Sequence, residues 1–141
     1  MPDRERYADG SGAMSAWTGD ELTRIDAAGE LQVRSMGPDG TLGKATTIWV
    51  VRVGDDLFVR SVMGEAAGWY RGTWARREGR ISGGGVTKDV SFEDAGHDLD
   101  DRIDRAYRHK YRRHADDIVD TVLTPEARST TMRLVPTSAT S

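Results

Sequence analysis

The residues best suited to chemistry gather in one stretch, residues 46–72, which reads TTIWVVRVGDDLFVRSVMGEAAGWYRG. Arg60 and Ser61 end a run rich in β-branched residues, and Trp69 and Arg71 follow within a glycine-bounded loop. A guanidinium and a hydroxyl can hold a phosphate, and glycines allow backbone amides to turn toward an anion. An indole can stack on an aromatic ring system. The stretch therefore predicts a site for a small molecule that carries a phosphate and a ring.

Other residues extend this candidate site, and some of its members have structural alternatives. Lys44, just before the stretch, could add a point charge for the phosphate, and Tyr70 could join Trp69 as a wall for the ring. Equally, both aromatic side chains could fill the core or a dimer interface. Arg60 could be a ligand-binding or a structural residue, and the sequence leaves the two roles open.

Two other kinds of site are not supported by residue types and spacing. The chain contains no cysteine, which excludes disulfides, thiol catalysis and cysteine-ligated metals. No Gly-x-Ser-x-Gly sequence marks a nucleophile. His109 and His114 are five residues apart, whereas metal ligands on one helical face are three or four apart. We therefore expect neither a hydrolytic triad nor a metal site.

Length and charge limit the classes of partner. The chain has 141 residues, the size of one ordinary domain, and a formal net charge of -3. That charge argues against nucleic-acid binding, and the basic residues between 102 and 114 are interleaved with acids. No apolar run approaches the ~20 residues that span a bilayer, and the N-terminus lacks the apolar segment of a secretion signal. The sequence predicts a cytoplasmic protein without nucleic-acid or membrane partners.

Composition divides the chain into three parts. Residues 1–14 are polar and glycine-rich, which is typical of a flexible tail. Residues 15–136 form a single predicted domain, and residues 137–141 form a second polar tail.

A helix is predicted over residues 19–28. Thr18 and Glu21 have the spacing of a capping box, in which each side chain bonds to the other residue's backbone N–H. Trp17 and Leu22 would then form a hydrophobic staple across the first turn. The ordered part of the chain is therefore expected to begin at Trp17.

Three strands joined by tight turns should follow this helix, over residues 30–36, 44–53 and 57–62. Gly-Pro-Asp-Gly after the first strand and Gly-Asp-Asp after the second are turn sequences. On the third strand, Phe58, Arg60 and Val62 share one face because side chains alternate along a strand.

The second half should add strands over 79–81 and 86–92, helices over 98–113 and 116–123, and a last strand over 130–135. Three glycines at 83–85 predict a hairpin turn, with a bulge or a close approach to a ligand as alternatives. Residues 69–77 form either a short helix or an irregular arm. Pro125 is expected to end the second helix.

This order of elements predicts the fold class. A helix, several antiparallel strands, two helices and a final strand suit an α+β, mainly β, protein. We expect a split antiparallel β-barrel of about six strands with flanking helices. Closing the sheet in this way avoids exposed edge strands.

Several segments together resemble a known group of proteins. A strand ending in FVRS and then GWYRG is similar to the split β-barrel flavin-binding superfamily, which includes pyridoxamine-phosphate-oxidase-like and deazaflavin-dependent nitroreductase-like proteins. Gly64 and Trp69-Tyr70 match a glycine and Trp-Tyr pair of the deazaflavin branch, whose Thr-Gly-Arg motif is replaced here by residues 41–44. More closely, IWVVRVGDDLFVRS, GWYRG, GRISGGG and AYRHKY resemble an uncharacterised bacterial family assigned to this fold, over about residues 17–136.

The resemblance implies a homodimer with a cofactor groove between its subunits. The cofactor would be FMN or a deazaflavin coenzyme, and the protein would be an oxidoreductase acting on a small organic substrate. The residues implied to hold the cofactor are Lys44, Arg60, Ser61, Trp69 and Arg71. The redox chemistry itself would belong to the cofactor.

Two alternatives use the same groove without that cofactor. One is a cofactor-free isomerase, cyclase or lyase of specialised metabolism, whose general acids or bases would be Tyr70, Tyr107, Lys88 and Lys110. The other is a non-catalytic protein that binds a small molecule. Because fold does not fix function, the sequence leaves these alternatives open.

Overall fold

The computed structural model describes residues 17–64, 67–73 and 76–137. Within these ranges the strands are β1 (Leu31–Ser35), β2 (Thr46–Ile48), β3 (Val50–Val53), β4 (Asp56–Val59), β5 (Glu78–Gly83), β6 (Val86–Asp94) and β7 (Met132–Pro136). The helices are α1 (Gly19–Ala27), α2 (Gly68–Thr73), α3 (Asp100–Lys110), α4 (Asp116–Asp120) and α5 (Pro125–Arg128).

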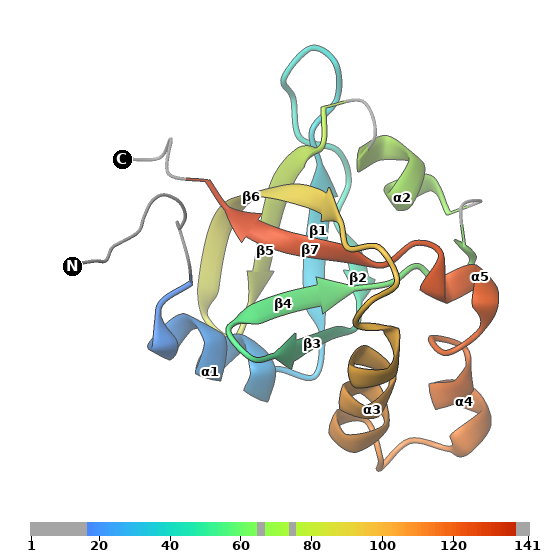
Figure 1. Ribbon diagram of the computed structural model, residues 1–141. Coiled ribbons are helices and arrows are strands. Elements are labelled where there is room, and N and C mark those ends of the chain that lie inside the picture. Colours follow the sequence, from blue (N-terminus) through green and yellow to red (C-terminus); the bar gives the residue numbers. More distant parts are fainter. Residues whose placement is uncertain (1–16, 65–66, 74–75, 138–141) are drawn as a thin grey trace.

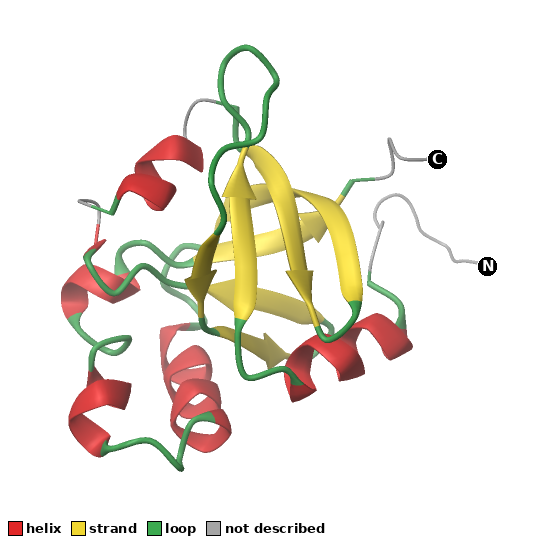
Figure 2. Ribbon diagram, turned by 180° about the vertical axis from the view of Figure 1, so that it is seen from behind, coloured by secondary structure: helices red, strands yellow, loops and turns green. Residues whose placement is uncertain are grey.

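The seven strands of the described chain form one antiparallel sheet, in the order β2-β1-β5-β6-β7-β4-β3. The sheet curls into a nearly closed barrel (Figure 1). Helix α1 lies across one end of the barrel, and α3, α4 and α5 group at one side of it (Figure 2). The predicted α+β, mainly β, split barrel with flanking helices is confirmed, with one strand more than the about six expected.

The barrel closes at Trp49. Only this residue separates β2 from β3 in the chain, yet the two strands occupy opposite ends of the strand order. The prediction of one continuous strand over 44–53 is therefore wrong, because the chain pairs with β1 before Trp49 and with β4 after it. The bend brings both edges of the sheet to one stretch of chain, which leaves little open edge.

Helix α3 supports the chain just after this bend. The N–H of Val50 donates to Tyr111 Oη at 3.2 Å, and its carbonyl accepts from Lys110 Nζ at 2.7 Å. Buried backbone groups must find partners, so these two side chains help to fix the bend.

Two apolar clusters lie on the two sides of β3 and β4. The barrel core consists of Trp17, Leu22, Ile25, Leu31, Val33, Val50, Leu57, Val59, Ala67, Tyr70, Ile81, Val86, Val90, Phe92, Met132 and Leu134. The α3 layer consists of Val51, Phe58, Ile103, Tyr107, Tyr111, Val119 and Val122.

Strand β4 is buried on both faces, and this decides where the next residue lies. Leu57 and Val59 belong to the barrel core, whereas Phe58 belongs to the α3 layer. The strand ends at Val59 rather than at Val62 as predicted. The alternation nevertheless continues for one step, so Arg60 lies on the Phe58 side and meets α3.

The glycine triplet forms the hairpin turn between β5 and β6, as predicted. Gly84 and Gly85 have φ values of 60° and 83°, which is the left-handed pair that a two-residue hairpin turn needs. A Cβ on Gly84 would lie 2.2 Å from the carbonyl oxygen of Arg24. The close approach at this turn is therefore to the backbone of α1.

Helix α1 begins as the sequence predicts. Thr18 Oγ1 accepts from the N–H of Glu21 at 3.1 Å, and Glu21 Oε1 accepts from the N–H of Thr18 at 2.9 Å. Trp17 and Leu22 are both buried in the barrel core. The cap and the apolar residues beside it thus direct α1 onto the end of the barrel.

The other helices differ from the predictions mainly at their ends. Of the two alternatives for residues 69–77, the short helix is correct, as α2. Helices α3 and α4 each end three residues before their predicted ends. The prediction that Pro125 ends a helix is wrong, because α4 already ends at Asp120 and Pro125 begins α5, where Thr124 Oγ1 caps the N–H of Ala127 at 3.0 Å. Proline suits the first helical position, where its missing N–H would have no partner.

The two predicted tails lie almost entirely outside the described residues, which leave out 1–16 and 138–141. None of the helices in the described ranges combines the length and apolarity needed to cross a membrane.

Candidate functional site

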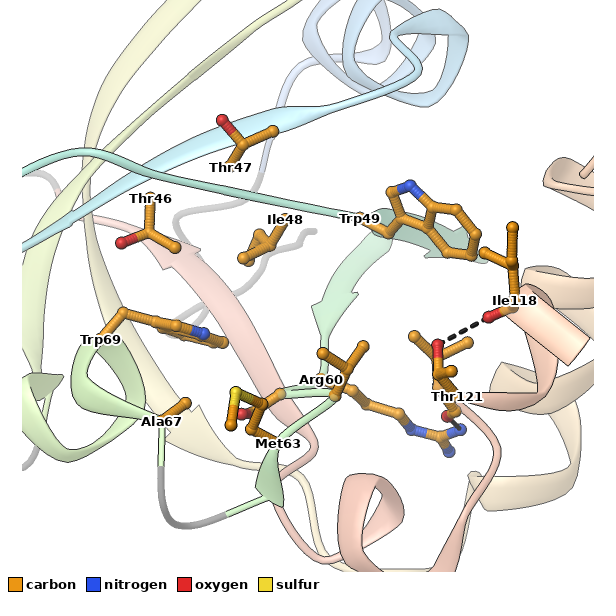
Figure 3. A pocket seen from close by; sticks show the side chains of 13 residues that line it. Thr46, Thr47, Ile48, Trp49, Arg60, Met63, Ala67, Trp69, Ile118 and Thr121 are labelled. Atoms are coloured by element: carbon orange, nitrogen blue, oxygen red, sulfur yellow. Dashed lines mark hydrogen bonds between the residues drawn. The ribbon is translucent and has the colours of Figure 1, made fainter.

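A cavity of about 370 Å³ lies beside the bend at Trp49 (Figure 3). We call it the tryptophan cavity. Its described lining residues are Thr46, Thr47, Ile48, Trp49, Arg60, Ser61, Val62, Met63, Ala67, Trp69, Ile118, Thr121 and Val122. They come from β2, the segment after β4, α2, and the region of α4, so four separate parts of the chain build one cavity.

The walls of the tryptophan cavity are mostly apolar. Trp69 and Trp49 lie at its two ends with Ile48 between them (Figure 3). Besides the Arg60 guanidinium and the two indole N–H groups, the polar side-chain groups are hydroxyls, and one of these, Thr121 Oγ1, already donates to the Ile118 carbonyl at 2.6 Å. Such walls favour a flat, largely apolar occupant.

A second cavity of about 360 Å³ adjoins the first, and we call it the polar cavity. Its lining residues are Ser35, Gly37, Thr41, Gly43, Lys44, Thr46, Gly68, Trp69 and Gly72. Thr46 and Trp69 line both cavities. Lys44 supplies the charged side chain of the described lining of the polar cavity. An apolar space and a polar space with a cation thus meet at Trp69.

Arg60 lines the tryptophan cavity, but its guanidinium is bound inside the protein. The residue is only 2% exposed. Its Nη1 donates to Asp104 Oδ1 at 2.6 Å and to the Val122 carbonyl at 2.9 Å, and its Nε donates to Thr131 Oγ1 at 2.9 Å. Its Nη2 lies 3.5 Å from Asp100 Oδ1. The side chain runs from the cavity wall toward Thr121 (Figure 3).

Asp104 connects Arg60 with Arg128, which donates to the other carboxylate oxygen. Burial alone would raise the pKa of Asp104, but the hydrogen bonds from Arg128 and Arg60 outweigh it and hold that pKa below its usual range. The Arg60 guanidinium also lies 5.6 Å from the centre of the Tyr107 ring. The charge of Arg60 is therefore compensated by acidic side chains of α3.

The remaining residues predicted to hold a cofactor divide between the cavities and the surface. Ser61 lines the tryptophan cavity, and its hydroxyl donates to the Gly64 carbonyl at 2.8 Å. Trp69 lines both cavities, and Lys44 lines the polar one. Arg71 is exposed and belongs to neither lining.

The profile of a family described as "Uncharacterized protein conserved in bacteria (DUF2255)" matches residues 21–134. This span contains every described lining residue of both cavities. The chain belongs to the DUF2255 family. The predicted resemblance to an uncharacterised bacterial family is thereby confirmed. No curated protein matches the sequence.

Solved structures share the fold of this DUF2255 chain at low sequence identity. HutZ, described as a heme storage protein from Vibrio cholerae, has a TM-score of 0.61 and 13% identity, and the match covers 85% of this chain and 90% of that one. A protein described as an F420 reductase has a TM-score of 0.55 and 15% identity, covering 82% and 92%. A conserved hypothetical protein from Mycobacterium tuberculosis has a TM-score of 0.52 and 12% identity, covering 85% and 80%. These similarities support the split-barrel fold.

The two tyrosines proposed as acids or bases are buried outside the tryptophan cavity. Tyr70 is part of the barrel core. Tyr107 is fully buried in the α3 layer, and among the described residues its hydroxyl has no hydrogen-bond partner. Burial raises the pKa of Tyr107. The phenol therefore stays protonated at any physiological pH.

The two lysines proposed as acids or bases also lie outside the tryptophan cavity. Lys88 Nζ pairs with Glu21 Oε2 at 2.6 Å, which joins β6 to α1. Lys110 Nζ donates to the Val50 carbonyl at 2.7 Å and lines a third cavity. Burial lowers the pKa of Lys110 to about 8. The structure thus separates these lysines from each other and from Trp69.

Some lining residues of the tryptophan cavity had no signal in the sequence. Trp49 was predicted only as part of a strand, and nothing marked the bend that exposes it to the cavity. Ile118, Thr121 and Val122 lie about seventy residues beyond Trp49 in the chain, and only the packing of α4 against the barrel brings them to the site. No group of three or more histidine or acidic side chains within the described ranges is placed to hold a metal ion.

Proposed function

We propose that this DUF2255 protein binds a flat aromatic coenzyme, FMN or a deazaflavin, in the tryptophan cavity and acts as an oxidoreductase through it. The observation that supports this most is the pairing of two tryptophans, Trp49 and Trp69, at the ends of one apolar cavity. A volume of about 370 Å³ is within the range of small-molecule sites.

The two cavities suit the two parts of such a coenzyme. The ring system would lie against Trp49, Ile48 and Trp69, where aromatic stacking and burial are both available. Its anionic tail would extend past Thr46 into the polar cavity, toward Lys44. Arg60 would form part of the cavity wall beside the ring. It would have a structural role there and would not bind the anionic tail, since its guanidinium is already paired with Asp104 of α3. When bound, the ring would supply hydride transfer to or from a small substrate.

Heme is a less suitable occupant, although one protein of similar fold is described as a heme storage protein. Heme iron needs an axial ligand such as histidine, cysteine, tyrosine or methionine. Among the described lining residues of the tryptophan cavity, Met63 is the one side chain of these types. It is 69% exposed at the rim, where it would hold an iron loosely.

A second copy of the chain would complete the site. The exposed large apolar side chains of the described residues are Val62, Met63 and Ile118, at 54%, 69% and 48% exposure. All three line the tryptophan cavity. Exposed apolar residues that gather around one cavity are typical of an interaction surface. We therefore propose a homodimer whose partner covers this rim.

A non-catalytic binding protein is the second candidate, and one observation favours it. The described lining of the tryptophan cavity contains no histidine, aspartate, glutamate, lysine or tyrosine. A cofactor-free isomerase, cyclase or lyase would need such a group within hydrogen-bond reach of its substrate. The cavity therefore suits either a coenzyme that brings its own chemistry or simple binding.

Titration of the purified protein with FMN, a deazaflavin coenzyme and hemin tests the proposal. We expect one of the two flavin classes to quench tryptophan fluorescence and to bind more tightly than hemin. Trp69→Ala should raise its Kd about 2- to 12-fold, the value of one aromatic stack. Lys44→Ala should raise it by no more than about 5-fold, because the lysine is exposed.

The matched control for Lys44→Ala is Arg24→Ala. Arg24 is a cation on α1 whose side chain lines neither cavity. Its Kd should equal that of the parent protein. Light scattering of the same samples should give the mass of a dimer. If neither FMN nor the deazaflavin binds, the proposed coenzyme is wrong. If the protein is a monomer, the proposed dimer that covers the cavity rim is wrong.

A further inference from the structure

A third cavity, of about 310 Å³, lies between α1, β3 and α3. We call it the lysine cavity. Its lining residues are Asp26, Val51, Arg52, Ala106, His109, Lys110 and Arg112. It shares no described lining residue with the tryptophan cavity or the polar cavity. It is therefore a separate place where a ligand could bind.

The lysine cavity has an excess of positive charge. Arg52 and Arg112 contribute two guanidinium groups and Lys110 an amine, against the carboxylate of Asp26 in the lining and that of Asp55, which lies 3.7 Å from Arg52 Nη2. A concave surface lined mostly by one sign of charge concentrates ions of the opposite sign. We therefore expect the ligands of this cavity to be small anions.

Lys110 is placed differently from the other two lysines of the chain. Lys88 is neutralised by Glu21 at 2.6 Å, and Lys44 is exposed. Lys110 Nζ instead donates to the uncharged Val50 carbonyl and lies 5.2 Å from the centre of the Tyr111 ring. Within the described residues it forms no ion pair, so no carboxylate holds its proton.

The surroundings favour the neutral amine. Burial lowers the pKa of Lys110 to about 8, with Asp26 of α1 acting in the opposite direction. Arg52 of β3, His109 of α3 and Arg112, two residues after the end of α3, line the same cavity, and the positive charge of a guanidinium near an amine also disfavours protonation of that amine. A useful fraction of the amine is then neutral near pH 7.5, whereas an ordinary lysine with a pKa of about 10.4 is almost fully protonated.

We propose that Lys110 is the nucleophile of a second site, which takes a small anionic aldehyde or 2-oxo acid as an imine. The nitrogen lone pair attacks the carbonyl carbon to give a carbinolamine. The carbonyl oxygen then leaves as water with both hydrogens of the neutral amine, so no oxidant or reductant is needed. Arg52 and Arg112 hold the carboxylate of the ligand. This site is independent of the proposed coenzyme.

Reductive trapping with 4-formylbenzoate and cyanoborohydride at pH 7.5 tests the proposal, followed by peptide mapping by mass spectrometry. The three lysines serve as internal comparisons in one sample. Lys110 should be labelled at least about tenfold faster than Lys44, because much more of its amine is neutral. The preference should shrink with benzaldehyde, which lacks the carboxylate. Equal labelling of Lys110 and Lys44 by 4-formylbenzoate would overturn the proposal.

Two arginine variants separate a binding site from a merely reactive amine. Arg112→Gln should slow labelling of Lys110 by 4-formylbenzoate several-fold and leave labelling by benzaldehyde unchanged. Arg113→Gln is the matched control, since its exposed side chain is next in sequence but outside the cavity lining. It should change neither rate. If both substitutions slow the labelling of Lys110 by 4-formylbenzoate equally, the effect comes from general surface charge. That result would overturn the proposed carboxylate-binding site.

Discussion

The barrel core and the α3 layer are both sealed from water, but different forces hold them together. Leu31, Val33 and Leu134 in the barrel core have at most 1% of their surface exposed, and their neighbours are almost all apolar. Beside the equally buried α3 layer, Arg60 and Asp104 form an ion pair at 2.6 Å. The comparison shows one chain using non-directional packing inside the barrel and directional charge pairing just outside it.

This difference affects how each region tolerates change. Burying a leucine contributes about 1.5–3 kcal/mol whatever the detailed orientation of its neighbours, so a core tolerates residues of similar volume. A buried guanidinium is stable only while its partner is charged and correctly placed. Substitutions that keep side-chain shape should therefore be mild in the barrel core and severe beside the α3 layer.

Asp104→Asn should have the largest effect of the substitutions that test this contrast. The change keeps the size of the side chain but removes the charge that compensates Arg60. Breaking a buried ion pair in this way costs about 3–5 kcal/mol. Urea unfolding followed by tryptophan fluorescence measures the loss.

The control for Asp104→Asn is Asp101→Asn on the exposed side of the same helix. It should change the free energy of unfolding by less than about 0.5 kcal/mol. If the two substitutions cost the same, the charge pair does not distinguish the α3 layer from the surface.

The contribution of the same ion pair should also appear in the pH dependence of the free energy of unfolding. The pKa of Asp104 in the folded protein is lowered, so its contribution to stability is present above its unfolded pKa of about 3.9 and is lost as the pH falls through the folded pKa. Below about pH 4, the parent protein should lose up to about 1.4 kcal/mol more per pH unit than Asp104→Asn. A difference between the two proteins that stays constant from pH 7 to pH 3 would contradict this.

The barrel core could be predicted from the sequence because its signal is local. Leu31 and Val33 alternate with polar residues, and the capping residues Thr18 and Glu21 are three positions apart. Such patterns depend on neighbours in the chain, so the split barrel, α1 and the β5–β6 turn follow from them. A local pattern also correctly placed Arg60 on the face of Phe58.

The site could be predicted only in part because it depends on distant segments. The sequence identified Lys44 and Trp69 as candidates for one site, and both line the polar cavity, with Trp69 also lining the tryptophan cavity. It gave no sign that Asp104, forty-four residues beyond Arg60, would pair with it. The bend at Trp49 is equally non-local, since β1 pairs with the chain before it and β4 with the chain after it.

Leu134→Met should have the smallest effect and completes the contrast with Asp104→Asn. Leu134 lies opposite Leu57 of β4 and Phe92 of β6, at the centre of the barrel core. Methionine has a similar volume and a flexible chain, so it can fill the same space at a cost below about 1.5 kcal/mol. The same urea experiment measures it. A cost equal to that of Asp104→Asn would mean that the barrel core demands as specific a partner as the buried arginine does, and the distinction between the two regions would fail.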